Sequence, residues 1–159
     1  MAFDTLLDKV DIPRDQIHIM DTSLFPEEAA LQYEKVLEEF FGSAVLPAQT
    51  FDLVLLGMGD DGHTLSLFPG TPVIHEEKQW VVSFFLKVQD MYRITLTKNI
   101  VNHADHIVFM ISGPDKAQAL HEVLEGERNP DRYPSQVIIP SQGELHFFMD
   151  EAAASGLKG

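Results

Sequence analysis

Residues 51–70 read FDLVLLGMGDDGHTLSLFPG, an apolar run of strand length that leads directly into a glycine-rich loop. Three glycines, two aspartates and one histidine lie within residues 57–63. Such a sequence predicts a buried strand that delivers one titratable side chain, His63, to a tight turn. We therefore interpret the rest of the chain as the scaffold of this loop.

An amphipathic helix is predicted before this stretch. It starts at Pro26, has residues 21–23 as cap candidates, and stops at Gly42. Its apolar residues recur at helical spacing, which predicts one buried face. The glutamates between them, Glu34 among them, are assigned to a solvated face.

The other segments also alternate between helix and strand patterns. We expect helical residues at 1–9, 98–103 and 116–124, and strand-like residues at 16–20, 51–56, 80–85, 92–97, 106–111, 137–139 and 145–149. Strand, glycine turn and helix follow one another twice. This order indicates an α/β fold whose largely parallel, Rossmann-like sheet is flanked by helices, with ligands at the carboxyl ends of its strands.

Length and composition restrict the class of protein. A chain of 159 residues with 45% hydrophobic content predicts one domain, 1–159. The formal net charge of −14 opposes binding to nucleic acid or to an anionic membrane, so neither partner is expected. The sequence has no cysteine, and it shows no signal peptide and no membrane-spanning run, so we expect a cytoplasmic protein.

The loop after the first apolar run has the composition of a site for an anion or an oxyanion. Glycines at Gly57, Gly59 and Gly62 let backbone N–H groups approach a ligand closely. Asp61 precedes His63 by two residues, so its carboxylate can orient the imidazole if the turn folds back. The loop has neither a third glycine at the spacing of dinucleotide-binding proteins nor a phosphate-binding lysine, which excludes both of these site classes.

Two further chemistries are rejected for this region. Ser66 does not stand in the Gly-x-Ser-x-Gly turn of serine hydrolases, so we interpret it as a local hydrogen-bonding residue. Residues 61–63 and 103–106 offer histidine and aspartate ligands, but neither segment has the spacing of a known zinc motif. We expect no metal and no cofactor.

The loop at residues 57–70, GMGDDGHTLSLFPG, is similar to the signature of the 6-phosphogluconolactonase family. The likeness extends to YRITLT at 92–97, SGPDKA at 112–117 and DEAAA at 150–154, in the same order. The resemblance implies an enzyme of the pentose phosphate pathway that hydrolyses 6-phospho-D-glucono-1,5-lactone to 6-phosphogluconate without a cofactor. It also implies the fold of that family.

The resemblance also implies roles for single residues. His63 resembles the general base that activates water, with Asp61 as its orienting partner. Arg93 and Lys116 are the residues that we expect near the substrate phosphate. Arginine suits bidentate phosphate contacts, and Lys116 lies in the first turn of a predicted helix, where backbone amides also favour an anion.

Related glucosamine-6-phosphate deaminases and isomerases share the histidine loop, and they carry a glutamate five residues after the histidine. This chain has Phe68 at that position, which favours the lactonase. The Ser-Gly-Gly and Asp-Glu-Arg motifs of lactonases do not occur, so the chain resembles the C-terminal two-thirds of such an enzyme, truncated at its N-terminus. The alternative is a noncatalytic module or subunit that needs an N-terminal half, and an exposed sheet edge would then favour self-association.

Overall fold

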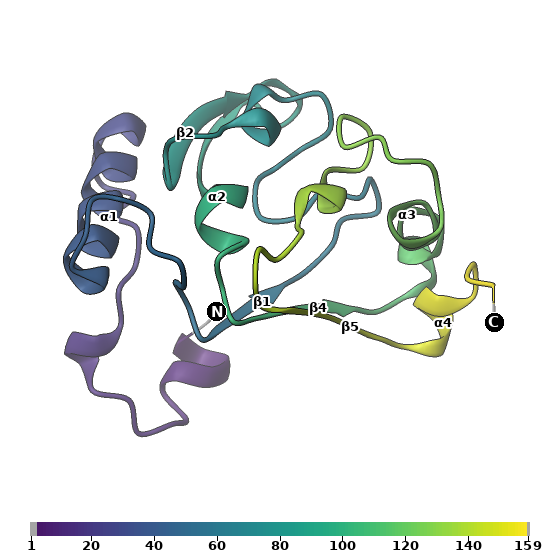
Figure 1. Ribbon diagram of the computed structural model, residues 1–159, viewed down its shortest axis with the longest axis horizontal. Coiled ribbons are helices and arrows are strands. Elements are labelled where there is room, and N and C mark those ends of the chain that lie inside the picture. Colours follow the sequence, from purple (N-terminus) through teal and green to yellow (C-terminus); the bar gives the residue numbers. More distant parts are fainter. Residues whose placement is uncertain (1–2, 159) are drawn as a thin grey trace.

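Three parallel strands form the central sheet of the computed structural model, which describes residues 3–158 (Figure 1). They are β1 (Leu53–Leu56), β4 (His106–Ile111) and β5 (Glu144–Met149), in the order β1-β4-β5. The register pairs Leu53 with His106, and His106 with Glu144. The predicted α/β fold with a parallel sheet is confirmed.

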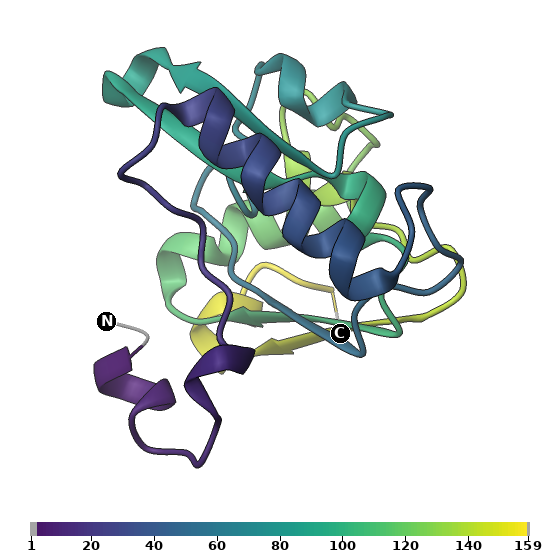
Figure 2. The ribbon, with the colours of Figure 1, turned by 90° about the vertical axis from the view of Figure 1, so that its left-hand side faces the viewer.

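A separate antiparallel hairpin lies beside this sheet. Its strands are β2 (Val81–Leu86) and β3 (Met91–Leu96), and Asp90 closes the turn in the left-handed region with φ +50°. The long helix α1 (Pro26–Phe41) lies across the hairpin, as Figure 2 shows. Both strands were expected from the sequence, whereas their separation from the parallel sheet was not.

Helix α1 begins at Pro26 and ends before Gly42, as predicted, but its N-cap differs from the predicted one. Gly42 adopts the left-handed conformation at φ +67° and stops the helix. At the other end the N-cap is Phe25, which has no side-chain capping bond, so the prediction of a cap at residues 21–23 is wrong. Asp21 accepts instead from the hydroxyl and N–H of Ser23, and this local turn lowers the pKa of Asp21.

Glu34 corrects the prediction that the glutamates of α1 are only solvated. Its carboxylate accepts hydrogen bonds from the backbone N–H groups of Trp80 and Val81, each at 2.8 Å. These two donors lie at the start of β2, and both residues are buried. Glu34 therefore links α1 to the hairpin through two hydrogen bonds.

We expect Glu34→Ala to destabilise the fold by about 1–3 kcal/mol, because two backbone N–H groups would lose their acceptor. The free energy of unfolding from a urea titration measures this effect. Glu39→Ala is the matched control, since the exposed Glu39 of the same helix should change stability by less than about 0.5 kcal/mol. Equal effects of the two substitutions would contradict the role of Glu34.

The remaining helices are short. The α-helices are α2 (Lys98–Val101), α3 (Ala117–Leu124) and α4 (Glu151–Ala154). A π-helical turn covers Phe3–Leu7, and 3-10 turns cover Arg14–Gln16, Pro72–His75, Lys87–Gln89, Pro114–Lys116 and Pro134–Val137. Residues 1–2 of the predicted first helix lie outside the described residues. Within residues 3–158, no helix combines the length and the apolar character needed to cross a bilayer.

Two strand-like predictions are wrong. Residues 17–20 follow a 3-10 turn as irregular chain, because no described strand pairs with them. Residue 137 ends a 3-10 turn and residues 138–139 are irregular, although Ile138 has extended dihedral angles. In both segments the side-chain pattern suits a strand, but a strand also requires a neighbouring backbone.

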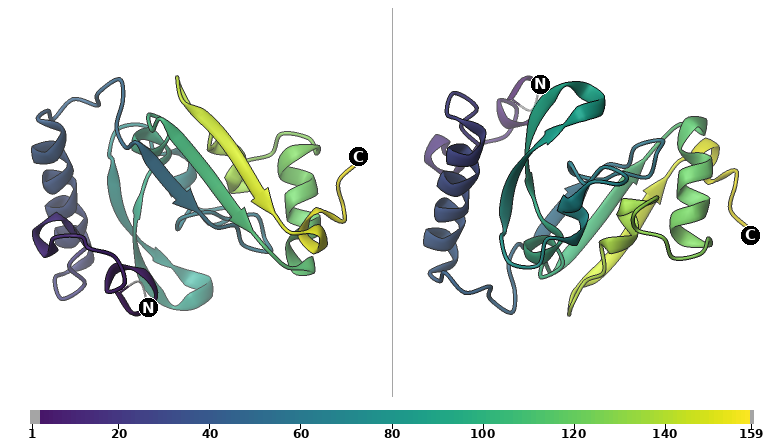
Figure 3. Two further views of the ribbon diagram at one scale, coloured as in Figure 1. Left: turned by 90° about the horizontal axis from the view of Figure 1, so that it is seen from below. Right: turned by 90° about the horizontal axis from the view of Figure 1, so that it is seen from above.

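The two faces of the parallel sheet differ. One face packs into the core, where the rings of Phe109 and Phe147 stack with their centres 4.9 Å apart. No described helix covers the opposite face, which is turned toward the viewer in the left view of Figure 3. The prediction that β1 is fully buried is therefore wrong, because Leu53 and Leu55 are 53% and 59% exposed on this outer face.

Candidate active site

The loop after β1 folds back on itself, which brings Asp61 to the imidazole of His63. The N–H of Gly59 donates to the carbonyl oxygen of His63 at 2.8 Å, and the N–H of Gly62 donates to the carbonyl oxygen of Gly59 at 3.0 Å. Gly62 has φ +78°, a conformation that glycine adopts without strain. The turn thus lies at the carboxyl end of a parallel strand, where α/β folds place their ligands.

The Asp61 carboxylate contacts the Nδ1 atom of the His63 ring. One carboxylate oxygen lies 2.6 Å from Nδ1 and also accepts the backbone N–H of His63 at 3.0 Å. A neutral imidazole that donates from Nδ1 carries its free electron pair on Nε2, the arrangement of a general base. The His63 side chain is 28% exposed, so water can reach it.

The backbone of Gly59 lies directly against this pair. A Cβ atom at this residue would lie 2.1 Å from His63 Nδ1 and 2.5 Å from the Asp61 carboxylate. By contrast, a Cβ atom at Gly57 would meet no atom within 4 Å, and this residue has no positive φ. A side chain at residue 59 would therefore displace the Asp61–His63 pair, whereas the structure gives no such reason for glycine at residue 57.

A distant segment supports the loop from its other side. The backbone N–H and the hydroxyl of Ser135 both donate to the carbonyl oxygen of Gly62, at 2.9 and 2.8 Å. A Cβ atom at Gly62 would lie 3.0 Å from the ring of Tyr133. The sequence did not predict the role of these two residues, because they lie between the segments predicted as helix 116–124 and strand 137–139, where nothing in the pattern indicates the contact.

Phe68 contacts both His63 and Arg93. Its ring is stacked on the imidazole with 4.1 Å between the centres, and the Arg93 guanidinium carbon lies 5.9 Å from the centre of the Phe68 ring. One Arg93 terminal nitrogen donates to Gln89, whereas its buried Nε has no hydrogen-bond partner among the described residues. The structure thus places the predicted phosphate ligand Arg93 near His63, with one donor unused.

Lys116 lies at the same edge of the sheet, in the turn that follows β4. Because β4 runs parallel to β1 as its neighbour, the two turns emerge side by side. The Lys116 ammonium lies 3.0 Å from the carboxylate of Asp115, and this hydrogen bond lowers the pKa of Asp115. Among the described residues, no hydrogen bond or ion pair joins Lys116 to His63.

A cavity of about 800 Å³ adjoins the loop. Its walls are mainly apolar and are formed by Asp61, residues 68–72 and residues 84–88 of the hairpin. His63 and Arg93 do not line it. The cavity therefore borders the site through Asp61 and Phe68, and the polar groups that suit catalysis lie beside it.

Comparisons with known proteins agree with these features. The family model described as glucosamine-6-phosphate isomerases/6-phosphogluconolactonase matches residues 1–147. A 6-phosphogluconolactonase of Synechocystis sp. is 40% identical over 153 residues, which are 96% of this chain and 62% of the relative. Another, of Rattus norvegicus, is 37% identical over 150 residues, which are 94% of this chain and 57% of the relative.

A solved structure agrees as well. The 6-phosphogluconolactonase from Trypanosoma cruzi superimposes with a TM-score of 0.81 at 26% identity, covering 99% of this chain and 65% of the other. This chain therefore spans less than two thirds of the length of all three proteins. The likeness confirms the predicted fold.

Proposed function

The chain belongs to the glucosamine-6-phosphate isomerase/6-phosphogluconolactonase family, and we propose that it hydrolyses 6-phospho-D-glucono-1,5-lactone to 6-phosphogluconate. The observation that carries this proposal is the 2.6 Å contact between Asp61 and His63 Nδ1, which leaves Nε2 free to accept a proton. The relatives of 37–40% identity that bear the name 6-phosphogluconolactonase support the same reaction.

In the proposed reaction His63 acts as a base and then as an acid. Nε2 takes a proton from water while the water oxygen attacks the lactone carbonyl carbon, and Asp61 stabilises the resulting imidazolium. The negative charge on the carbonyl oxygen is stabilised by backbone N–H groups of the glycine loop other than those of Gly59, Gly62 and His63, which donate within the turn. When the intermediate collapses, the bond to the ring oxygen breaks and this oxygen receives the proton from Nε2. The product is one open-chain molecule, 6-phosphogluconate, which carries both the new carboxylic acid group, which ionises, and the new hydroxyl group.

Arg93 and Lys116 are proposed to hold the substrate phosphate. The unused buried Nε of Arg93 supports its assignment, because a phosphate oxygen would give this donor a charged acceptor. Lys116 is supported only by its position at the edge of the sheet shared with His63.

Arg93→Ala should raise KM for the phosphorylated lactone by about 10- to 100-fold, because a hydrogen bond to a charged group contributes roughly 1.5–3 kcal/mol. Steady-state kinetics with glucono-1,5-lactone, which has no phosphate, provides the comparison, since its KM should change little. The control Arg14→Ala removes an exposed arginine that pairs with Asp8. A rise in KM of the same size for both lactones would contradict phosphate binding by Arg93.

A comparison of substrates tests the proposed function against the deaminase alternative. Purified chain is incubated with 6-phospho-D-glucono-1,5-lactone in one experiment and with glucosamine 6-phosphate in another. We expect the lactone to be lost faster than by its spontaneous opening, and we expect no release of ammonia from glucosamine 6-phosphate. The reason is that Phe68 replaces the glutamate that the resemblance assigns to deaminases. Release of ammonia with no lactone hydrolysis would reverse the assignment.

The alternative of a noncatalytic module rests on the part of the relatives that this chain spans, 57–65% in the three comparisons. Such a module should be inactive alone and should hydrolyse the lactone only when it is combined with an N-terminal half.

For the location we propose the cytoplasm, since a chain without cysteine suits a reducing compartment.

We also propose that the isolated chain pairs with a second copy through the free edge of β1. No described strand pairs with this edge, and Leu53 and Leu55 of β1 itself are exposed on the outer face beside it. Sedimentation velocity at increasing concentration should show a dimer, which Leu55→Lys weakens and the control Leu31→Lys on α1 does not. A monomer at every concentration would contradict self-association.

A further inference from the structure

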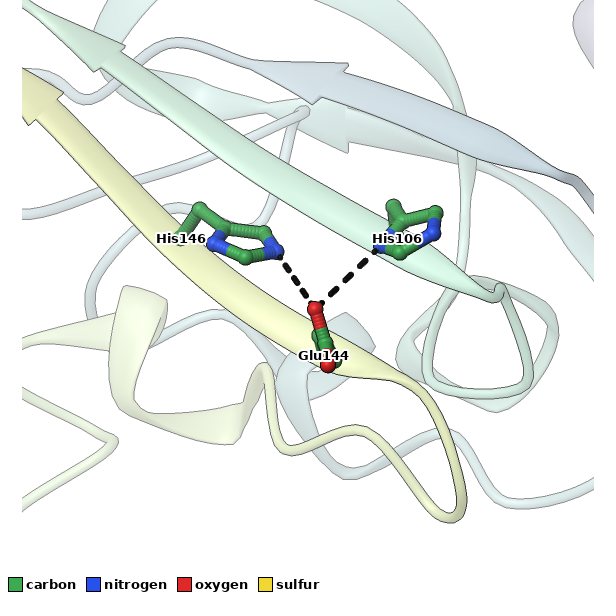
Figure 4. Close-up of side chains that lie close together, drawn as sticks. All are labelled: His106, Glu144 and His146. Atoms are coloured by element: carbon green, nitrogen blue, oxygen red, sulfur yellow. Dashed lines mark ion pairs between the residues drawn. The ribbon is translucent and has the colours of Figure 1, made fainter.

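Three side chains with metal-binding atoms lie together on the outer face of the parallel sheet. His106 and Glu144 are directly paired across β4 and β5, and His146 lies two residues after Glu144 on the same face, opposite Val108. Both imidazoles are turned toward the Glu144 carboxylate, as Figure 4 shows. The site lies on strands β4 and β5, away from the loop after β1 that carries His63.

The distances suit a small cation. His146 Nε2 and His106 Nδ1 lie 3.2 and 3.7 Å from the same Glu144 oxygen, and one potential ligand atom from each residue lies within 4.8 Å of the others. Ligands at about 2.0–2.1 Å from a tetrahedral zinc ion are roughly 3.3 Å apart. Small rotations of exposed side chains can therefore bring all three atoms to one ion without a change in the backbone.

We propose that His106, Glu144 and His146 bind Zn²⁺. Two imidazole nitrogens and one carboxylate oxygen form a common ligand set for this ion, with a fourth position left for water. Val108 and Leu53 are the register partners of His146 and His106, so apolar side chains flank the ligands. Spacing along the sequence does not reveal this set, because Glu144 and His146 come from a different strand than His106.

The chemistry of the ligands also determines which ions compete. Imidazole nitrogen suits zinc, copper and nickel, whereas Mg²⁺ prefers a shell of oxygen atoms. Zn²⁺ should therefore bind with one equivalent per chain in the presence of excess Mg²⁺.

Calorimetric titration of the purified chain with Zn²⁺ tests the site. His106→Ala and His146→Ala should each lower the affinity at least about tenfold, since even outer partners of metal ligands change affinity by about 10–100-fold. Two controls remove other histidine–carboxylate pairs: His75→Ala, whose partner is Asp131, and His63→Ala. Both should keep the full affinity and the stoichiometry of one.

Side-chain NMR of the imidazoles gives a second readout that does not depend on activity. Zn²⁺ should shift the ring nitrogens of His106 and His146 and leave those of His75 in place. Circular dichroism shows whether the variants fold. Equal zinc affinity of the unmodified chain, His106→Ala and His146→Ala would overturn the proposal, as would the absence of binding to the unmodified chain. His146→Ala should hydrolyse the lactone at the same rate as the unmodified chain. The zinc proposal and the lactonase proposal can therefore be rejected independently.

Discussion

His63→Ala is expected to lower kcat for 6-phospho-D-glucono-1,5-lactone by about 10²- to 10⁴-fold, the range that general acid–base catalysis contributes. The substitution removes the imidazole of the glycine loop, whose Nε2 is the proposed acceptor of the proton from water. The substrate should still bind, so KM should change far less than kcat. Proton release in a pH-stat, corrected for spontaneous opening of the lactone, measures the rate.

Two controls separate the loss of the base from damage to the fold. His75→Ala removes a histidine that is also paired with an aspartate, at 2.7 Å, and it should retain the full rate. Thermal unfolding of His63→Ala should resemble that of the unmodified chain, because His63 is partly exposed. A folded His63→Ala chain with unchanged kcat would remove His63 from the mechanism.

Gly59→Ala should also reduce hydrolysis strongly, although it leaves every polar side chain in place. The added methyl carbon would lie 2.1 Å from His63 Nδ1 and 2.5 Å from the Asp61 carboxylate, so the two side chains cannot both keep the positions in which they form their 2.6 Å contact. A displacement of this kind costs about 10²-fold in rate. Comparison of kcat for the unmodified and substituted chains measures it.

Gly57→Ala is the matched control, because it adds the same methyl group to the same loop and keeps the backbone N–H. Its methyl carbon would meet no atom within 4 Å, so its loss of rate should be at least about tenfold smaller than that of Gly59→Ala. The steric explanation fails if the two substitutions reduce kcat equally. NMR of the His63 ring should show the displacement directly in Gly59→Ala.

Sequence patterns predicted the elements whose formation depends on the spacing of side chains along a short stretch of the chain. The apolar runs at 51–56 and 106–111 became β1 and β4, and the periodic residues before Gly42 became α1. The glycine loop also placed Asp61 beside His63, because a tight turn brings residues two apart into contact. These features follow from side-chain periodicity and turn chemistry, which act over a few residues.

The contacts that were missed join segments far apart in the chain. Glu34 was assigned to solvent because its helix pattern is amphipathic, but the N–H groups at the start of β2 lie within its reach. Ser135 supports Gly62 for a similar reason, since the packing of a distant turn positions it. The outer face of β1 was predicted as buried because an apolar run does not reveal whether a second layer covers the sheet.

The most direct measurement follows 6-phospho-D-glucono-1,5-lactone by NMR while the concentration of the purified 159-residue chain is raised. If the chain is a lactonase, the rate of lactone loss increases in proportion to its concentration above the spontaneous rate, and 6-phosphogluconate forms in equal amount. His63→Ala at the same concentrations should give only the spontaneous rate or slightly more. Lactone loss that does not change with the concentration of the folded chain would contradict the proposed function.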